Sequence, residues 1–131
     1  MQFDKLVFTF FNGDIAARYL PQVLDGARVT IELGLAVIAA GLALGIVLAY
    51  LRSLPVRGLP LLVSTLVDIL RALPPLVLII LFYYALPFLG LSLGAFASTW
   101  LALTLVLAAF SEEVFCCLLY TSDAADDSLR V

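Results

Sequence analysis

Histidine is absent from this chain of 131 residues, and charged residues make up only 13% of it. Without histidine there is no imidazole to ligate a metal ion or to act as a general base. The two cysteines, Cys116 and Cys117, are neighbours, so they do not easily form an ordinary disulfide and are too few for a metal site. Seven Lys and Arg residues form no basic face that could meet phosphate, which argues against a nucleic-acid partner. The sequence also lacks a nucleophile–base pair and a glycine-rich phosphate loop, so we expect neither an enzyme nor a cofactor.

Apolar residues, in contrast, make up 64% of the chain, and the mean hydropathy is +1.16. Soluble domains are about 45–50% apolar, and one this small could not bury so much apolar surface. The composition therefore predicts an all-α integral membrane protein surrounded by lipid, with room for about three spans of roughly 20 residues each.

The last fifteen residues differ in character from the rest of the chain. Residues 117–131 read CLLYTSDAADDSLRV, and suitable codons for residues 117–127 reproduce a sequencing adapter. We therefore expect this stretch not to be native and exclude it from fold reasoning. Its removal takes away three Asp and one Arg, which changes the net charge from −3 to −1. The alternative is a natural acidic tail.

Three segments are predicted to span a membrane, at residues 29–51, 61–86 and 96–115. Residues 1–28 precede them as a periplasmic or interfacial segment. Its apolar residues recur at helical spacing, but Pro21 interrupts the pattern, so we expect short interfacial helical pieces. A plain solvated leader is the alternative.

Basic residues predict the orientation of these spans. The loop after the first span carries Arg52 and Arg57, whereas the turn at residues 87–98 has no charge. The positive-inside rule then places Arg52 and Arg57 in the cytoplasm and the N-terminus outside. Lys5, Arg18 and Arg28 argue against this orientation.

The second span contains the polar features that are least expected in lipid. Asp68 and Arg71 lie one helical turn apart and can face each other, either inside a cavity or in the headgroups of the cytoplasmic boundary. Pro74 and Pro75 follow, and they predict a kink with or without a moving role.

The first and third spans carry two further candidate features. Gly41 and Gly45 form a GxxxG pattern, with Gly34 one heptad earlier on the same face, which predicts close helix packing. Glu112 and Glu113 end the third span, where a hydrated exit from the membrane is the plainer interpretation.

Four motifs occur in the order found in one family. They read LPQVLDGARVT at 20–30, DILRALPPLVL at 68–78, FYYALP at 82–87 and AAFSEEVF at 108–115. The second is similar to a family segment of the form EFFRGTPLLVQ, and the fourth to AAYxAEIF followed by Arg-Gly. On these motifs residues 15–116 resemble the permeases of polar amino-acid ABC importers. The chain departs from the pattern at Leu78, which stands for Gln, and at Cys116, which stands for Arg.

The resemblance implies a fragment of the type I ABC importer permease fold, located in a bacterial inner membrane with its N-terminus outside. It also implies that about half of the permease is missing, including the cytoplasmic loop that docks on the ATP-binding subunit. The implied partners are a cytosolic ATP-binding subunit, a second permease subunit that forms a homodimer or heterodimer with the first, and a periplasmic solute-binding protein. Asp68 and Arg71 would then stabilise the packing or the gate of the second helix.

Two alternatives remain. A small non-transporting membrane scaffold or permeabilising protein would have a natural stop near residue 131. A permease of the same fold could also carry another solute, such as methionine or phosphonate.

Overall fold

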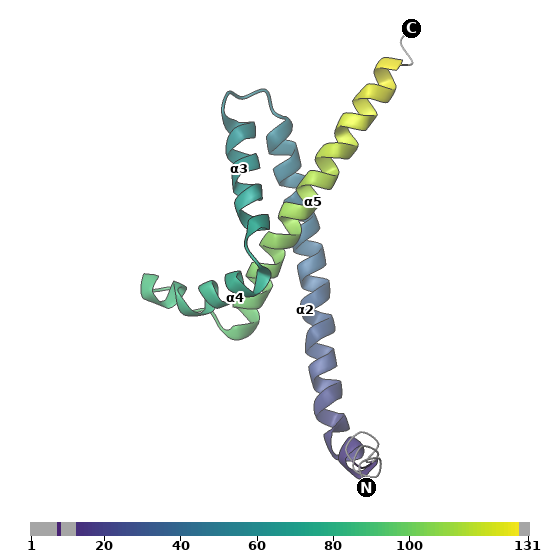
Figure 1. Cartoon of the computed structure of the whole chain (residues 1–131), viewed down its shortest axis with the longest axis vertical. Helices are drawn as coiled ribbons and strands as arrows, with labels where there is room; N and C mark the ends of the chain where they lie inside the picture. The colour runs from purple at the N-terminus through teal and green to yellow at the C-terminus, as the bar shows by residue number, and fades with distance from the viewer. Residues whose placement is uncertain (1–7, 9–12, 129–131) are drawn as a thin grey trace. The chain divides into compact units, whose positions relative to one another are not determined.

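A computed structural model describes residue 8 and residues 13–128 of the chain. The parts of the predicted N-terminal segment and of the adapter-like tail outside these residues lie outside the described structure. The described residues form helices and connecting turns, with no strand among them, which confirms the all-α prediction (Figure 1). Two compact units, residues 1–34 and 35–131, divide the chain within its first long helix.

The helix α2 runs without a break from Gly13 to Ser53. Asp14 in its first turn and Arg52 in its last turn have the charges that the helix dipole favours. The prediction that Pro21 separates short helical pieces is wrong, because the helix continues through this residue. A single proline removes only one backbone donor, and long apolar helices tolerate that loss.

The helix α3, Leu59–Ala72, follows a short loop in which Gly58 has a φ of 88°. This left-handed conformation is one that glycine adopts without strain. α3 is amphipathic, and its valines Val63 and Val67 are buried against Ala109 of α5. Leu48 and Leu51 of α2 pack against the same cluster.

The helix α4, Pro75–Tyr84, is separated from α3 by a sharp break of 96°. The predicted continuous span at 61–86 is therefore divided, and the break is stronger than the kink that we expected. Leu73 and Pro74 both have extended backbones, with ψ values of 129° and 137°. Each of these residues precedes a proline, and the following ring disfavours the helical conformation. Figure 1 shows α4 running across the direction of α3.

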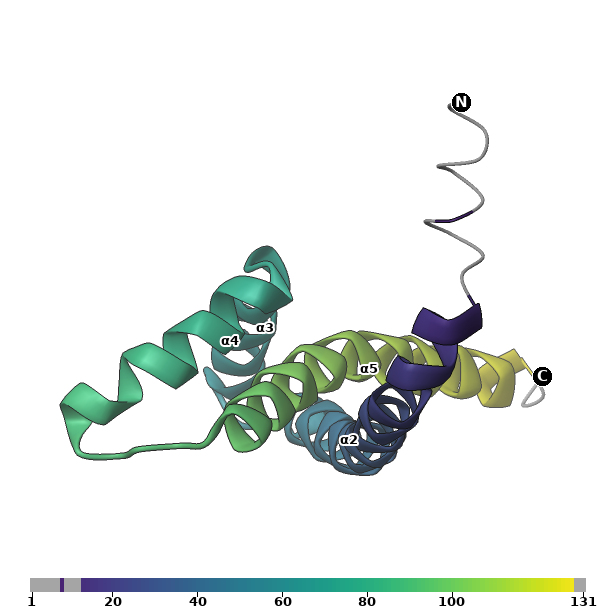
Figure 2. The ribbon, with the colours of Figure 1, turned by 90° about the horizontal axis from the view of Figure 1, so that it is seen from below.

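A short 3₁₀ helix, η1 (Leu86–Leu89), and an extended link then lead to the last helix, α5 (Ala95–Ser128) (Figure 2). α5 is the helix on which the others pack. Its residues Ala102 and Val106 form a buried cluster with Leu78 of α4, while Ala109 meets α3.

Two helices, Gly13–Ser53 and Ala95–Leu119, are long and apolar enough to cross a membrane. The bent pair α3–α4 adds a third crossing if it acts as one broken span, and none if it is a re-entrant loop. The chain is accordingly an all-α membrane protein. Most of the large apolar side chains on α3 and α4 are exposed, as expected of surfaces that face lipid or further helices.

Candidate functional site

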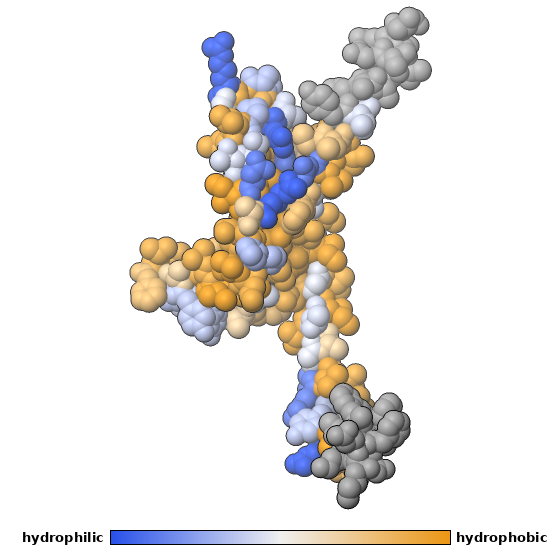
Figure 3. Space-filling model, in the orientation of Figure 1, coloured by the Kyte–Doolittle hydropathy of each residue, from blue (hydrophilic) through white to orange (hydrophobic). Residues whose placement is uncertain are grey.

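Four charged residues of unit 35–131 meet where α2, α3 and α5 lie together, namely Arg52, Arg71, Glu112 and Glu113. Figure 3 shows hydrophilic surface gathered over α3 and α5 in this region, while the surface around α4 is largely apolar. Two ion pairs account for the contacts among these charges, and α5 supplies the acidic partner of both.

Glu112 is the most deeply buried charged residue among those described, with a relative exposure of 0%. Its two carboxylate oxygens accept hydrogen bonds from Nη1 of Arg52, at 3.1 and 3.3 Å. Arg52 lies in the last turn of α2, and its side chain is 35% exposed. A carboxylate removed from solvent in this way needs a paired cation, because an isolated buried charge is very costly.

Glu113 pairs instead with Arg71, at the end of α3. The Arg71 guanidinium also lies over the ring of Phe110, 5.2 Å from the ring centroid, at a distance suited to a cation–π contact. This second pair is partly solvated, with side-chain exposures of 30% for Arg71 and 48% for Glu113. Adjacent residues on a helix point about 100° apart, so the two glutamates reach different helices.

Asp68 does not form the predicted pair with Arg71. It is exposed on α3, and among the described residues no ion pair joins it to Arg71. The spacing of one turn permits such a pair, but Arg71 is directed to α5, where a carboxylate and an aromatic ring are both available.

Arg52 is a site residue that sequence reasoning used only for orientation. The signal that could have found its partner was the match between a basic residue ending the first span and an acidic residue ending the third. If both ends face the same side of the membrane, the two side chains are at the same depth and can meet. Sequence alone did not separate Glu112 from Glu113, since both were interpreted as a hydrated exit.

The three candidate packing glycines of the first span differ in how closely other helices approach them. A Cβ on Gly41 would come within 2.8 Å of the Leu107 side chain, and one on Gly45 within 2.6 Å of Cβ of Ser111. Both positions therefore allow α2 and α5 to approach closely. A Cβ on Gly34 would meet no atom within 4 Å.

Pro74 and Pro75 lie outside this charged region but adjoin it in sequence. Pro74 is the cap of α4 and Pro75 its first residue, so the break falls two residues after α3 ends. The proline pair therefore separates the helix that carries Arg71 from the apolar helix α4.

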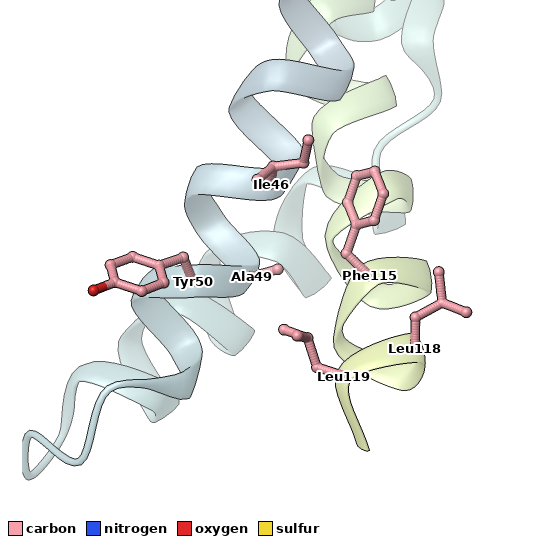
Figure 4. Close-up of a pocket in the computed structure, with 6 residues that line it drawn as sticks. All are labelled: Ile46, Ala49, Tyr50, Phe115, Leu118 and Leu119. Atoms are coloured by element: carbon pink, nitrogen blue, oxygen red, sulfur yellow. The ribbon is translucent and has the colours of Figure 1, made fainter. Parts of the chain in front are cut away.

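A pocket of about 320 Å³ lies between α2 and α5, close to the end of α2 (Figure 4). Figure 4 shows Tyr50 pointing away from the facing α5 residues, while Ile46 and Phe115 approach each other. The lining is almost wholly apolar, so the pocket offers no group for polar recognition. Across the described residues, no three His, Cys, Asp or Glu side chains gather in a way that could hold a metal ion. The arrangement of ion pairs and apolar contacts holds the helices together.

Comparison with known proteins agrees with the motifs of the sequence. The chain is 31% identical over 104 residues to the probable glutamine ABC transporter permease protein GlnP of Bacillus subtilis (strain 168). The chain resembles an ABC transporter permease. The match covers 79% of the chain and 48% of the relative, so the chain spans about half the length of the curated relative that it matches. The predicted resemblance to the polar amino-acid ABC permeases is thereby confirmed.

No family model matches the chain, and no solved structure matches it. The similarity to the permease therefore rests on the sequence comparison and not on a solved structure. The all-α membrane architecture is observed independently of it.

Proposed function

We propose that the chain is part of the membrane-spanning subunit of an ATP-driven importer for polar amino acids. The observation that carries the proposal is the 31% identity over 104 residues to a glutamine ABC transporter permease. The apolar helices and the central ion pairs of α5 support it, since a transport subunit needs helices that pack on one another within lipid.

In the proposed system this subunit performs no covalent chemistry itself. A second permease subunit, identical or related, would complete a path between the helices. Separate cytosolic ATP-binding subunits would shift the path between inward-open and outward-open states through their differential affinity for the two. A periplasmic solute-binding protein would deliver the substrate.

The proposed location is a bacterial inner membrane, with the N-terminus outside. The argument for this orientation is that the end of α2 carries Arg52 and the loop after it carries Arg57, while the described link between η1 and α5 has no charged residue. Arg52 and Arg71 would then lie near the cytoplasmic boundary, together with the two glutamates of α5.

The test begins with the uninterrupted reading frame beyond residue 116. We expect it to continue into a cytoplasmic loop and further spans. The complete product, reconstituted in proteoliposomes with the ATP-binding subunit and solute-binding protein encoded beside it, should take up glutamine or another polar amino acid only when ATP is enclosed. A natural stop at Val131 together with absent uptake would contradict the proposal and favour the non-transporting scaffold. ATP-dependent uptake of a different solute class would retain the fold and change the substrate.

A further inference from the structure

The two neighbouring glutamates of α5 bind different helices and differ strongly in exposure. Glu112 is fully buried and holds Arg52 of α2, whereas Glu113 is 48% exposed and holds Arg71 of α3. We propose that α2 and α5 stay packed together, and that the Arg71–Glu113 ion pair holds α3 against these two helices reversibly. The inference concerns helix contacts alone and does not rest on the proposed transport activity.

The contact between α2 and α5 resists opening for two independent reasons. Separation of Arg52 from Glu112 would leave a carboxylate with no cation in a site that excludes solvent. The glycine contacts add close backbone packing, because the space beside Gly41 and Gly45 is filled by Leu107 and Ser111 of α5. Helices held by both kinds of contact are expected to move together.

The contact between α3 and α5 is of a different kind. Its apolar part is a cluster of Val63 and Val67 with Ala109 of α5, and Leu48 and Leu51 of α2 and Leu59 and Leu70 of α3 pack around it. Within a bilayer, valines that leave a helix contact meet lipid, which is as apolar as the contact that they lost. The apolar contacts therefore give little resistance to separation of α3 from α5, and the Arg71–Glu113 ion pair determines whether α3 stays in place.

That ion pair can open because both partners are partly solvated. Arg71 and Glu113 retain exposures of 30% and 48%, so water can hydrate each charge when the pair separates. Partly solvated pairs are weak and are screened by salt. α3 is also not continuous with its neighbours, since Gly58 precedes it in a left-handed conformation and the extended Leu73 follows it.

Distances between spin labels on the full chain in lipid nanodiscs test the proposal. Cys116 and Cys117 are first replaced by Ser, so that the only labels are those introduced. One double variant, Val47→Cys with Val114→Cys, reports on α2 and α5, and another, Leu62→Cys with Val114→Cys, reports on α3 and α5. All three positions are at least half exposed.

We expect Glu113→Gln to broaden the α3–α5 distance distribution at least twofold and to leave the α2–α5 distribution unchanged. A rise to 1 M salt should broaden the α3–α5 distribution of the parent in the same way. The charge exchange Arg71→Glu with Glu113→Arg should narrow it again. The matched variant Glu112→Gln should broaden the α2–α5 distribution, and the exchange Arg52→Glu with Glu112→Arg should restore it if the single variant fails to fold.

Two results would overturn the proposal. One is an α3–α5 distribution that Glu113→Gln and high salt both leave unchanged, which would mean that the ion pair does not hold α3. The other is equal broadening of both distributions by Glu113→Gln, which would mean that α2 and α5 are not a separate pair.

Discussion

Because Arg52 pairs with a fully buried carboxylate, its removal is expected to lower the stability of the protein more than the removal of any other described cation. The substitution Arg52→Ala would leave Glu112 uncompensated, and breaking a buried pair from one side costs about 3–5 kcal/mol. We expect the free energy of unfolding in mixed micelles, measured by SDS titration, to fall by that amount.

Arg28→Ala is the matched control, because it removes the same side chain from an exposed pair. Arg28 and Glu32 lie one turn apart on α2 with side-chain exposures of 79% and 54%. Such pairs contribute about 0.3–0.5 kcal/mol. Equal losses for the two variants would show that burial of Glu112 has no energetic consequence.

The glycine contacts predict opposite effects of one substitution at two positions. Gly45→Ala places a Cβ 2.6 Å from Cβ of Ser111 and 3.1 Å from the backbone oxygen of Ala108, neither of which can rotate away. We expect overpacking to destabilise the chain by about 1–3 kcal/mol in the same titration. Gly34→Ala meets open space and should be neutral, or stabilising by roughly 0.5–1 kcal/mol, because alanine favours helix. A stable Gly45→Ala variant would refute the close approach.

At the scale of the helical elements, the prolines show how far a sequence can be interpreted. The composition and the apolar runs predicted an all-α membrane protein and located the helices approximately. They did not distinguish Pro21, which α2 absorbs, from the pair Pro74–Pro75, which ends one helix and begins another. The difference is physical, since a proline that precedes another proline makes two successive residues extended.

Replacement of both prolines is expected to join α3 and α4. In Pro74→Ala with Pro75→Ala, residues 59–84 regain the two missing backbone donors and should form one straighter helix. Spin labels at residues 62 and 81 would then be separated by about 28 Å, from a rise of 1.5 Å per residue. In the parent, the 96° break should give a clearly shorter distance. An unchanged distance would mean that contacts with α5, and not the prolines, impose the bend.

The ion pairs set a second limit on sequence reasoning. A spacing of one turn made Asp68 a reasonable partner for Arg71, and the actual partner lies 42 residues further along the chain at Glu113. Local spacing reveals which groups can meet within a helix, but not which neighbouring helix offers a better contact. The rotation of α5 about its axis decides this, and that rotation is fixed by tertiary packing, which includes the contacts of Ala102, Val106 and Ala109.

For the whole molecule, the central question is whether the bent pair α3–α4 crosses the membrane. A crossing would place the loop after α2 and the link before α5 on opposite faces, whereas a re-entrant loop would place them on one face. Single cysteines at Ser53 and Ser92, in the background without Cys116 and Cys117, can be labelled by an impermeant maleimide on intact cells and on inverted vesicles.

We expect Ser53→Cys to react from the cytoplasmic face only and Ser92→Cys from the outer face only, in agreement with the position of Arg52 and Arg57. Reaction of both from the cytoplasmic face would establish a re-entrant pair and leave two crossings. Reaction of Ser53→Cys from the outer face and of Ser92→Cys from the cytoplasmic face would invert the proposed orientation while retaining the three crossings.

Because the two glutamates are adjacent, the ion pairs of α5 depend on how its side chains are rotated about the helix axis. One alanine inserted between Phe110 and Ser111 would leave every upstream contact intact and turn all later side chains by about 100°. The inserted alanine would then take the position of Ser111 beside Gly45, and Ser111 would take the position of Glu112 and face Arg52. Glu112, which pairs with α2 in the parent, would take the position of Glu113 beside Arg71. The insertion of one codon would thus remove the ion pair of α2 and leave α3 with one, without altering the charge of the molecule.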